Sequence, residues 1–256
     1  MGHALRLVFD PEGDVLAAAR ECEAEVFAQW FGNTRAQFAE EYAPYESNSV
    51  FVALADEHDD VVACARFLTS CRGPLKSIDD MQRAPWGIDA RRSAAAVDVN
   101  LARTWDIATM GVRPGAAKEQ IRLAFALYHG IITSVRVNNA TDIVAILDER
   151  VRQLLDSVGI IMRPFPGAGP QPYLGSSASA PVFGRVSRCV YRQRRHFPDA
   201  YRLITLGIGL GDIAVPPRDD FRLRARQQPV TSSPGAGQLQ LGADQRSHTA
   251  RQSVNV

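Results

Sequence analysis

The stretch that decides the fold is Trp105-Asp-Ile-Ala-Thr-Met-Gly-Val-Arg-Pro-Gly-Ala-Ala-Lys-Glu-Gln-Ile-Arg-Leu-Ala124. Residues 104–112 are compact and apolar except for Asp106, which predicts a buried strand. Pro114-Gly115 breaks that strand, and residues 118–128 resume at helical spacing. A helix that follows a tight turn presents unpaired N–H groups and the positive end of its dipole, which favour a phosphate or pyrophosphate. An anion site and a plain strand-to-helix connection are both compatible with this stretch.

Composition and charge narrow the class of protein. The chain has 256 residues, of which 46% are hydrophobic, and this is ample for a buried core. The formal net charge is +1, and no cluster of Lys and Arg is interleaved with aromatic residues. Nucleic-acid binding is therefore not expected. The short basic run 192–195 is interpreted as a solvated face.

Cysteine usage and the ends of the chain predict a cytoplasmic protein. The four cysteines are scattered without the spacing of a metal site, and a chain of 256 residues does not need disulfide staples. The first residues lack the apolar core of a signal peptide. The longest apolar segment, residues 203–215, contains several glycines and is too short to cross a bilayer. No metal site and no membrane span are expected.

The rest of the chain alternates between strand and helix patterns. Residues 141–147 form a β-branched run that predicts a buried strand, and the stretch from strand 104–112 through a helix to this strand implies that the two strands are parallel or splayed neighbours. The other predicted elements are a strand at 5–9, a helix at 15–31, a hairpin from a turn at 40–49 through strands near 50–54 and 61–67, a long connection at 71–96, a helix at 148–158, a strand at 160–165, a loop at 166–180, a strand at 182–186 and a short helix at 197–206.

Two motifs in the central stretch carry a resemblance to a known family. Val112-Arg-Pro-Gly-Ala-Ala resembles the pyrophosphate loop of GCN5-related N-acetyltransferases (GNAT). Asp106-Ile-Ala-Thr-Met-Gly-Val112 is similar to the Glu-x-Ser-Arg-x-x-Val strand of autoinducer synthases and N-acyl amino acid synthases, a branch of the same fold. The chain departs from that branch at three positions, with Asp106 in place of Glu, Ala108 in place of Ser and Thr109 in place of Arg. Its loop also lacks the Arg or Gln and the second Gly of ordinary acetyltransferases.

The resemblance extends to the hairpin. Tyr45-Glu46 is similar to the Tyr-Asp turn that precedes this hairpin in the same branch, and Arg66 stands where the branch has the Arg that ends the second strand. The resemblance implies that Glu46 orients the acceptor and that Arg66 faces a carbonyl or carboxylate. A structural pair, in which Glu46 caps the turn and Arg66 binds it, is equally compatible with the residues.

Aromatic residues are candidates for an apolar substrate pocket. Trp30 and Phe31 end the first predicted helix, and Trp86 lies in the long connection, where the branch places part of its acceptor and acyl-chain pocket. Burial in the core, or a Trp that pins the loop to the body, is the alternative at each position. Trp30, Arg66 and Trp86 are the predicted substrate-binding residues.

The resemblance implies a fold and a domain organisation. The expected fold is α/β and GNAT-like, with a mixed, mostly antiparallel central sheet splayed at the cofactor loop and flanked by helices. Residues 1–215 are expected to form the acyltransferase domain. Residues 216–256 are rich in Gln, Ser, Gly and Arg without apolar periodicity, and are expected to be a disordered tail.

The resemblance also implies an activity. The donor would be an acyl thioester on coenzyme A or on the phosphopantetheine of acyl carrier protein, used as co-substrate with no permanently bound cofactor, and the acceptor would be a small amine. Asp106 is the predicted catalytic carboxylate that takes up the amine proton, with Glu46 as its orienting partner. A structural Asp106 that binds backbone N–H groups is the alternative. The oxyanion would need a backbone N–H near residues 108–110. The donor phosphate is assigned to Met110, Val112, Arg113, Gly115, Ala116, Ala117 and Lys118.

Two classes of function follow. One is an N-acyltransferase that uses a medium or long acyl chain. The other is a degenerate, non-catalytic GNAT-fold module for binding or regulation, which the departures at Ala108 and Thr109 and the missing loop glycine favour.

Overall fold

The computed structural model describes residues 5–115 and 117–224. They build an eight-stranded sheet in the order β1-β2-β3-β4-β5-β8-β6, with β7 paired to β8. The strands are β1 (Arg6–Phe9), β2 (Ser49–Ala55), β3 (Val61–Thr69), β4 (Thr104–Val112), β5 (Asp142–Asp148), β6 (Arg163–Pro164), β7 (Gln171–Tyr173) and β8 (Ser176–Arg185).

The central feature of the sheet is the junction of β4 and β5. These strands are parallel and pair only from Thr104–Asp142 to Asp106–Val144, after which they separate. Every other pairing of named strands in the sheet is antiparallel. The predicted mixed, mostly antiparallel and splayed sheet is therefore confirmed.

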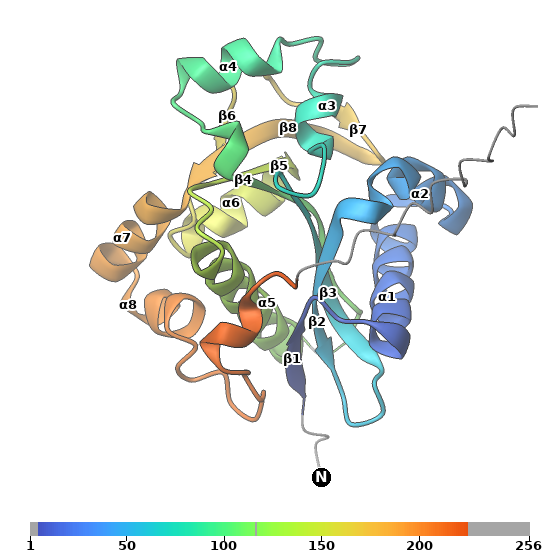
Figure 1. Ribbon diagram of the computed structural model, residues 1–256, viewed down its shortest axis with the longest axis vertical. Coiled ribbons are helices and arrows are strands. Elements are labelled where there is room, and N and C mark those ends of the chain that lie inside the picture. The colour runs from blue at the N-terminus through green and yellow to red at the C-terminus, as the bar shows by residue number, and fades with distance from the viewer. Residues whose placement is uncertain (1–4, 116, 225–256) are drawn as a thin grey trace, which may run out of the picture. The chain divides into compact units, whose positions relative to one another are not determined.

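Helices cover both faces of the sheet (Figure 1). Helices α5 to α8 lie on one face, whereas α1 to α4 lie on the other. Their bounds are α1 (Gly13–Phe31), α2 (Arg35–Tyr42), α3 (Lys76–Asp80), α4 (Ala90–Ala96), α5 (Ala117–Val137), α6 (Glu149–Ser157), α7 (Val186–His196) and α8 (Pro198–Ala200), with 3₁₀ turns at Ala43–Asn48, Leu101–Arg103 and Arg218–Phe221 and a π-helical turn at Tyr201–Thr205.

Strand β2 shows why both faces are covered. Val50, Val52 and Leu54 pack into the core beneath α5, and the alternate residues Phe51 and Ala53 pack against α1. All five are at most 1% exposed. A strand that is apolar on both faces must be buried on both faces, because successive side chains point in opposite directions.

The sequence placed some elements wrongly. Residues 166–180 were expected to form a loop, but they contain β7 and the start of β8. The Ser and Ala residues of this segment carry no strong strand pattern, yet β8 pairs with the whole of β5 and gains order from that ladder. The strand expected at 160–165 shrinks to Arg163–Pro164. Helix α2 was missed, although Thr34 and Gln37 form a capping box at its start.

The expected boundary at residue 215 falls before the end of the packed body. Phe221 is fully buried, and its ring lies 5.9 Å from that of Phe9. Arg218–Phe221 is therefore part of the folded unit rather than of the tail. Residues 225–256, the remainder of the expected tail, lie outside the described residues. None of the described helices combines the length and the apolar character needed to span a bilayer.

Candidate active site

A pocket of about 190 Å³ occupies the place where β4 and β5 separate. It is lined by side chains from both faces of the sheet, and therefore passes between the two strands. One side is formed by Phe27, Phe31, Tyr42, Lys76, Ser77, Tyr173 and Leu174, the middle by residues 107–110 and 145–148, and the other side by Tyr128, Ile131, Ile132, Val151, Leu155, Ile160, Met162, Cys189 and Ile204. The last of these groups, on the α5 side of the sheet and here called the far side of the pocket, is almost entirely apolar, which suits a hydrocarbon chain.

The edge of β4 borders this pocket. Beyond Asp106, β4 pairs with none of the described strands on its β5 side. On the other side, the register with β3 shifts between Arg66–Thr109 and Phe67–Ile107, so that Ala108 is the extra residue of a bulge. The Tyr42 hydroxyl donates a hydrogen bond of 3.1 Å to the Ala108 carbonyl. Residues 107–110, which follow the end of the pairing with β5, line the pocket.

Asp106 lies directly behind the pocket wall. Its side chain is fully buried, and its two oxygens accept hydrogen bonds from the Ser77 backbone N–H (2.6 Å) and the Ser77 hydroxyl (2.7 Å). Ser77 lines the pocket, whereas Asp106 does not. Burial raises the pKa of Asp106 to about 7, even though the hydrogen bonds from Ser77 act in the opposite direction. The carboxylate thus holds the first turn of α3 and reaches the pocket through one hydroxyl.

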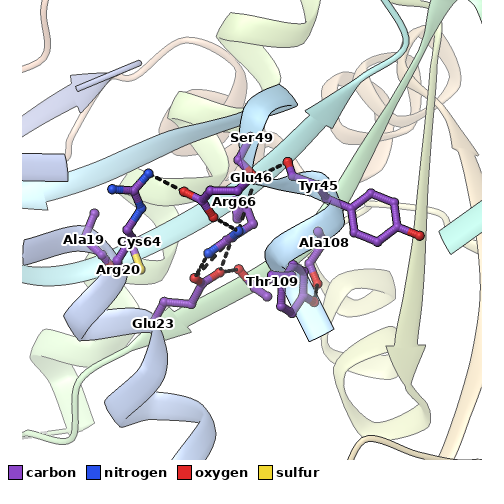
Figure 2. Close-up of polar contacts among 11 residues, drawn as sticks. Ala19, Arg20, Glu23, Tyr45, Glu46, Ser49, Cys64, Arg66, Ala108 and Thr109 are labelled. Carbon is purple, nitrogen blue, oxygen red and sulfur yellow. Dashed lines mark hydrogen bonds and ion pairs between the residues drawn. The ribbon is translucent and has the colours of Figure 1, made fainter. Parts of the chain in front are cut away.

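Glu46 and Arg66 belong to a second group of polar residues, here called the Arg66 cluster: Arg20, Glu23, Glu46, Arg66 and Thr109. Figure 2 shows Arg66 between the carboxylates of Glu23 and Glu46, with Arg20 bound to the same Glu46. The Arg66 side chain is 4% exposed and binds Glu23 through Nη2 (2.5 Å) and Nε (2.9 Å). Its Nη1 binds Glu46 at 2.9 Å. Thr109 donates a hydrogen bond to Glu23.

The electrostatics of this cluster favour the charged forms. Burial alone would raise the pKa of Glu46, but Arg66 and Arg20 outweigh it and hold the pKa below its usual value. Burial would lower the pKa of Arg66, but Glu23 outweighs it and the net pKa is raised. The pairing of Glu46 with Arg66, one of the two predicted alternatives, is present. Neither residue lines the pocket.

A third group was not predicted. Lys76 is 2% exposed and forms ion pairs with Glu41 and Asp80, and its ammonium lies 2.8 Å from the Tyr173 hydroxyl. Lys76 and Tyr173 line the pocket beside Tyr42. In the sequence, a Lys in a polar connection looks like any solvated residue. Its burial becomes visible only in the structure, where α2, α3 and β7 meet around it.

The aromatic residues that the sequence suggested as substrate-binding lie at different positions relative to the pocket. Trp30 is 62% exposed and does not line the pocket, whereas Phe27 and Phe31 of the same helix do. Trp86 donates a hydrogen bond of 3.0 Å to the Gly169 carbonyl, and its ring lies 5.3 Å from that of Tyr173. Trp86 therefore holds its loop in place, and it lies next to the pocket residue Tyr173 without lining the pocket itself.

The predicted donor loop is described in part. Helix α5 begins at Ala117, so the expected turn and helix start are present. Met110 lines the pocket, Val112 is half-buried, and Arg113 forms an ion pair of 2.8 Å with Glu25. Gly115 has open space where a side chain would stand. Ala116 and the side chains of Ala117 and Lys118 lie outside the described residues.

The turn between β7 and β8 gives a stability prediction. Gly175 has φ +87°, and a Cβ atom there would lie 2.2 Å from the Phe31 carbonyl oxygen. Gly175→Ala is therefore expected to destabilise the protein by about 1–3 kcal/mol, through strain and a backbone clash. Urea unfolding measures this change. Gly115→Ala is the matched control, because its site is open, and equal effects of the two variants would contradict the prediction.

The sequence matches no protein-family model and no curated protein. Solved structures, in contrast, share its fold. The acyl-homoserine lactone (AHL) synthase LasI superposes with a TM-score of 0.53 at 12% identity, covering 72% of this chain and 91% of LasI. BjaI, a CoA-dependent acyl-homoserine lactone synthase solved with SAM and isopentyl-CoA, gives 0.52 at 14% identity over 86% and 97% of the two chains.

A third structure comes from the other predicted group. FeeM, an N-acyl amino acid synthase from uncultured soil microbes, superposes with a TM-score of 0.55 at 10% identity, covering 75% of this chain and 95% of FeeM. At these identities the likeness concerns the fold. The chain therefore has the fold of these acyl-homoserine lactone and N-acyl amino acid synthases, the fold that its central motifs predict.

Proposed function

We propose that the chain is an N-acyltransferase that moves a medium or long acyl group, not an amino-acyl group, from an acyl thioester to a small amine. The observation that carries the proposal is the apolar pocket that passes through the sheet beside the free edge of β4. A hydrocarbon chain fits its far side, and a reacting carbonyl fits its middle, where residues 107–110 line the wall.

The start of α5 is the proposed binding site of the acyl donor. In the proposal, a phosphate of coenzyme A or of phosphopantetheine lies at residues 113–118, where helix N–H groups and the helix dipole favour an anion. The thioester carbonyl then lies against β4, and a backbone N–H of residues 108–110 stabilises the oxyanion. The likeness to BjaI, which was solved with isopentyl-CoA, supports an acyl-CoA donor.

The acceptor must lose a proton before or during attack. In the proposal, the acceptor binds as its ammonium ion and gives one proton to the Ser77 hydroxyl, which passes its own proton to the Asp106 carboxylate and leaves a neutral amine to attack. The new C–N bond forms as the C–S bond breaks, and the leaving sulfur takes up the second proton lost by the nitrogen. A carboxylate with a pKa of about 7 is well matched to this role at neutral pH. The likeness to FeeM, an N-acyl amino acid synthase, supports an amine acceptor.

Native mass spectrometry tests donor binding. The purified protein is mixed with acyl-CoA thioesters from acetyl to palmitoyl, and retention of one chain-length class is expected. Gly115→Trp should abolish retention without disturbing the fold, because no atom of the described residues beyond its chain neighbours lies within 4 Å of the position of a Cβ there, and Gly115→Ala is the control. Loss in both variants, or in neither, would contradict a donor site at this turn. The same panel on acyl carrier protein tests the second donor.

Turnover separates the enzyme from a binding module. Release of free thiol is followed with the retained donor and a set of amines and amino acids. Amide formation with one amine class supports the acyltransferase. Retention of a thioester without release would favour the non-catalytic alternative that the sequence left open.

A substitution in the middle of the pocket is expected to change the length of the preferred acyl chain. Ala145 lines the pocket and is 1% exposed. Ala145→Leu adds three carbons to the wall, so the preferred acyl chain is expected to become shorter. The measurement is the order of retention across the acyl-CoA panel, with the melting temperature as a check on the fold. An unchanged order in a well-folded variant would show that the chain does not run past Ala145.

A further inference from the structure

One polar group in the pocket has no partner. Tyr128 of α5 lines the pocket and is 5% exposed. Among the described residues, its hydroxyl makes no hydrogen bond, and burial raises the pKa of Tyr128 to about 12. Most pocket residues on its side of the sheet are apolar, among them Ile131, Ile132, Leu155 and Ile204, and Cys189 adds a thiol, a weak hydrogen-bonding group.

The other tyrosines of this region differ in this respect. Tyr42 donates to the Ala108 carbonyl, Tyr45 to Asp79, and Tyr173 to Asp80. Buried tyrosine hydroxyls normally find such a partner, because an unpaired one loses its hydrogen bonds to water without replacement. Phe would fill the same space without that loss. The oxygen of Tyr128 is therefore a group whose partner is absent from the described part of the chain.

The oxygen also keeps access to open space. Within residues 5–115 and 117–224, the polar side-chain atoms that are both fully enclosed and unpartnered are on Asn33, Asn48, Arg72 and Arg122, and Tyr128 is not among them. Tyr128 is 5% exposed and lines the pocket, so the pocket is the open space beside it that the structure describes. A bound molecule is then the natural partner of the hydroxyl.

We infer that the pocket selects acyl chains that carry an oxygen, as a hydroxyl or keto group, on the segment that lies beyond the sheet, and that Tyr128 determines this specificity by a hydrogen bond. The inference rests on the proposed function, since it assumes an acyl chain in the pocket. Residues 107–110, where the proposal places the thioester, lie on β4, whereas Tyr128 lies on the α5 side. The oxygen it binds is therefore in the interior of the chain and not next to the thioester.

The test compares wild type with Tyr128→Phe, which removes one oxygen and keeps the ring. Retention of dodecanoyl-CoA is compared with that of its derivatives that carry a hydroxyl or keto group at a mid-chain carbon. Wild type should prefer one of these derivatives over dodecanoyl-CoA by about tenfold, the factor that one buried hydrogen bond supplies, and Tyr128→Phe should lose that preference. Equal preference in the two proteins would overturn the inference while leaving the acyltransferase proposal in place.

A second comparison does not depend on the thioester. Alkanes and ketones of matched length are used as pocket probes, and their binding is followed by the shift in melting temperature. A preference for the ketone that Tyr128→Phe abolishes supports the inference even if no thioester binds, and no preference overturns it. Without ligand, Tyr128→Phe should leave the melting temperature unchanged or higher. A fall of several degrees would show a protein partner for the hydroxyl and would also overturn the inference.

Discussion

Asp106→Asn is expected to lower the acyl-transfer rate by about 100- to 10,000-fold, the range that a general base contributes. Asn keeps the size of the side chain and can still accept a hydrogen bond from the Ser77 backbone N–H. It cannot take up a proton from the Ser77 hydroxyl. Donor binding should be unchanged, because Asp106 does not line the pocket. Thiol release under saturating donor and amine measures the rate.

The pH dependence provides the control. The base must be ionised, so the wild-type rate should rise with pH through about 7, the pKa of Asp106, and level off above it. The residual activity of Asp106→Asn should lack this step. Ser77→Ala should lower the rate by a similar factor, because it removes the hydroxyl that joins the carboxylate to the pocket. Full activity in either variant would leave Asp106 as a structural carboxylate.

The same carboxyl group links stability to pH. The pKa of Asp106 is about 7 in the folded protein, against an ordinary value of 3.8. Between these values the unfolded chain has lost its proton and the folded protein has kept it, so the contribution of Asp106 to stability falls as pH rises through this window. The loss is on the order of 4 kcal/mol across the window. Asp106→Asn should remove this slope in urea unfolding, and identical slopes would show that the folded pKa is not raised.

The sequence predicted the parts of the site that are local. The apolar run of β4, the turn at Pro114-Gly115 and the helix after it follow from periodicity and turn residues within one segment. The single acidic residue of that run, Asp106, is a candidate because it stands where the resembling motif has Glu. Its partner Ser77 was not, since 29 positions separate them and a Ser in a loop has no distinctive pattern.

The parts that depend on tertiary packing were not predicted. Glu23 lies on a helix whose apolar face was recognised, but its burial becomes visible only when α1 meets Arg66 of β3 and Thr109 of β4. The choice of Trp30 over Phe31 failed for a similar reason. The two residues are adjacent, and which one faces the pocket depends on the rotation of α1 against the sheet.

The departures at Ala108 and Thr109 can be understood from the Arg66 cluster. The branch that the motif resembles has Arg at the position of Thr109. Here Thr109 instead donates a hydrogen bond to Glu23, and the buried charge of Glu23 is balanced by Arg66. Ala108 contributes its carbonyl to Tyr42 at the bulge. Both departures thus fit a local network that keeps β4 in place, and they leave the backbone edge of the strand facing the pocket.

Arg66→Met is expected to destabilise the protein by about 3–5 kcal/mol, because it leaves a buried carboxylate without its cation. Glu23 is 2% exposed, and Arg66 is its ion-pair partner, so Thr109 would be the remaining donor. Met fills most of the Arg66 volume between the rings of Tyr42 and Phe51. The loss of stability therefore measures the effect of the buried charge more than that of packing. Urea unfolding measures the change in the free energy of unfolding.

Two comparisons separate the buried charge from the rest of the network. Arg20→Met removes the other arginine bound to Glu46, but the Arg20 side chain is 46% exposed, so a change of at most about 1 kcal/mol is expected. Glu23→Leu combined with Arg66→Met removes both buried charges and should recover most of the stability lost by Arg66→Met alone. If the double variant were no more stable than Arg66→Met, the loss would come from packing around Tyr42 and Phe51 instead. Recovery would mean that the Glu23–Arg66 ion pair positions the site rather than stabilising the fold. Arg66 binds Glu23 of α1 and packs on the ring of Tyr42. Tyr42 in turn binds the bulge of β4, where the thioester is proposed to react.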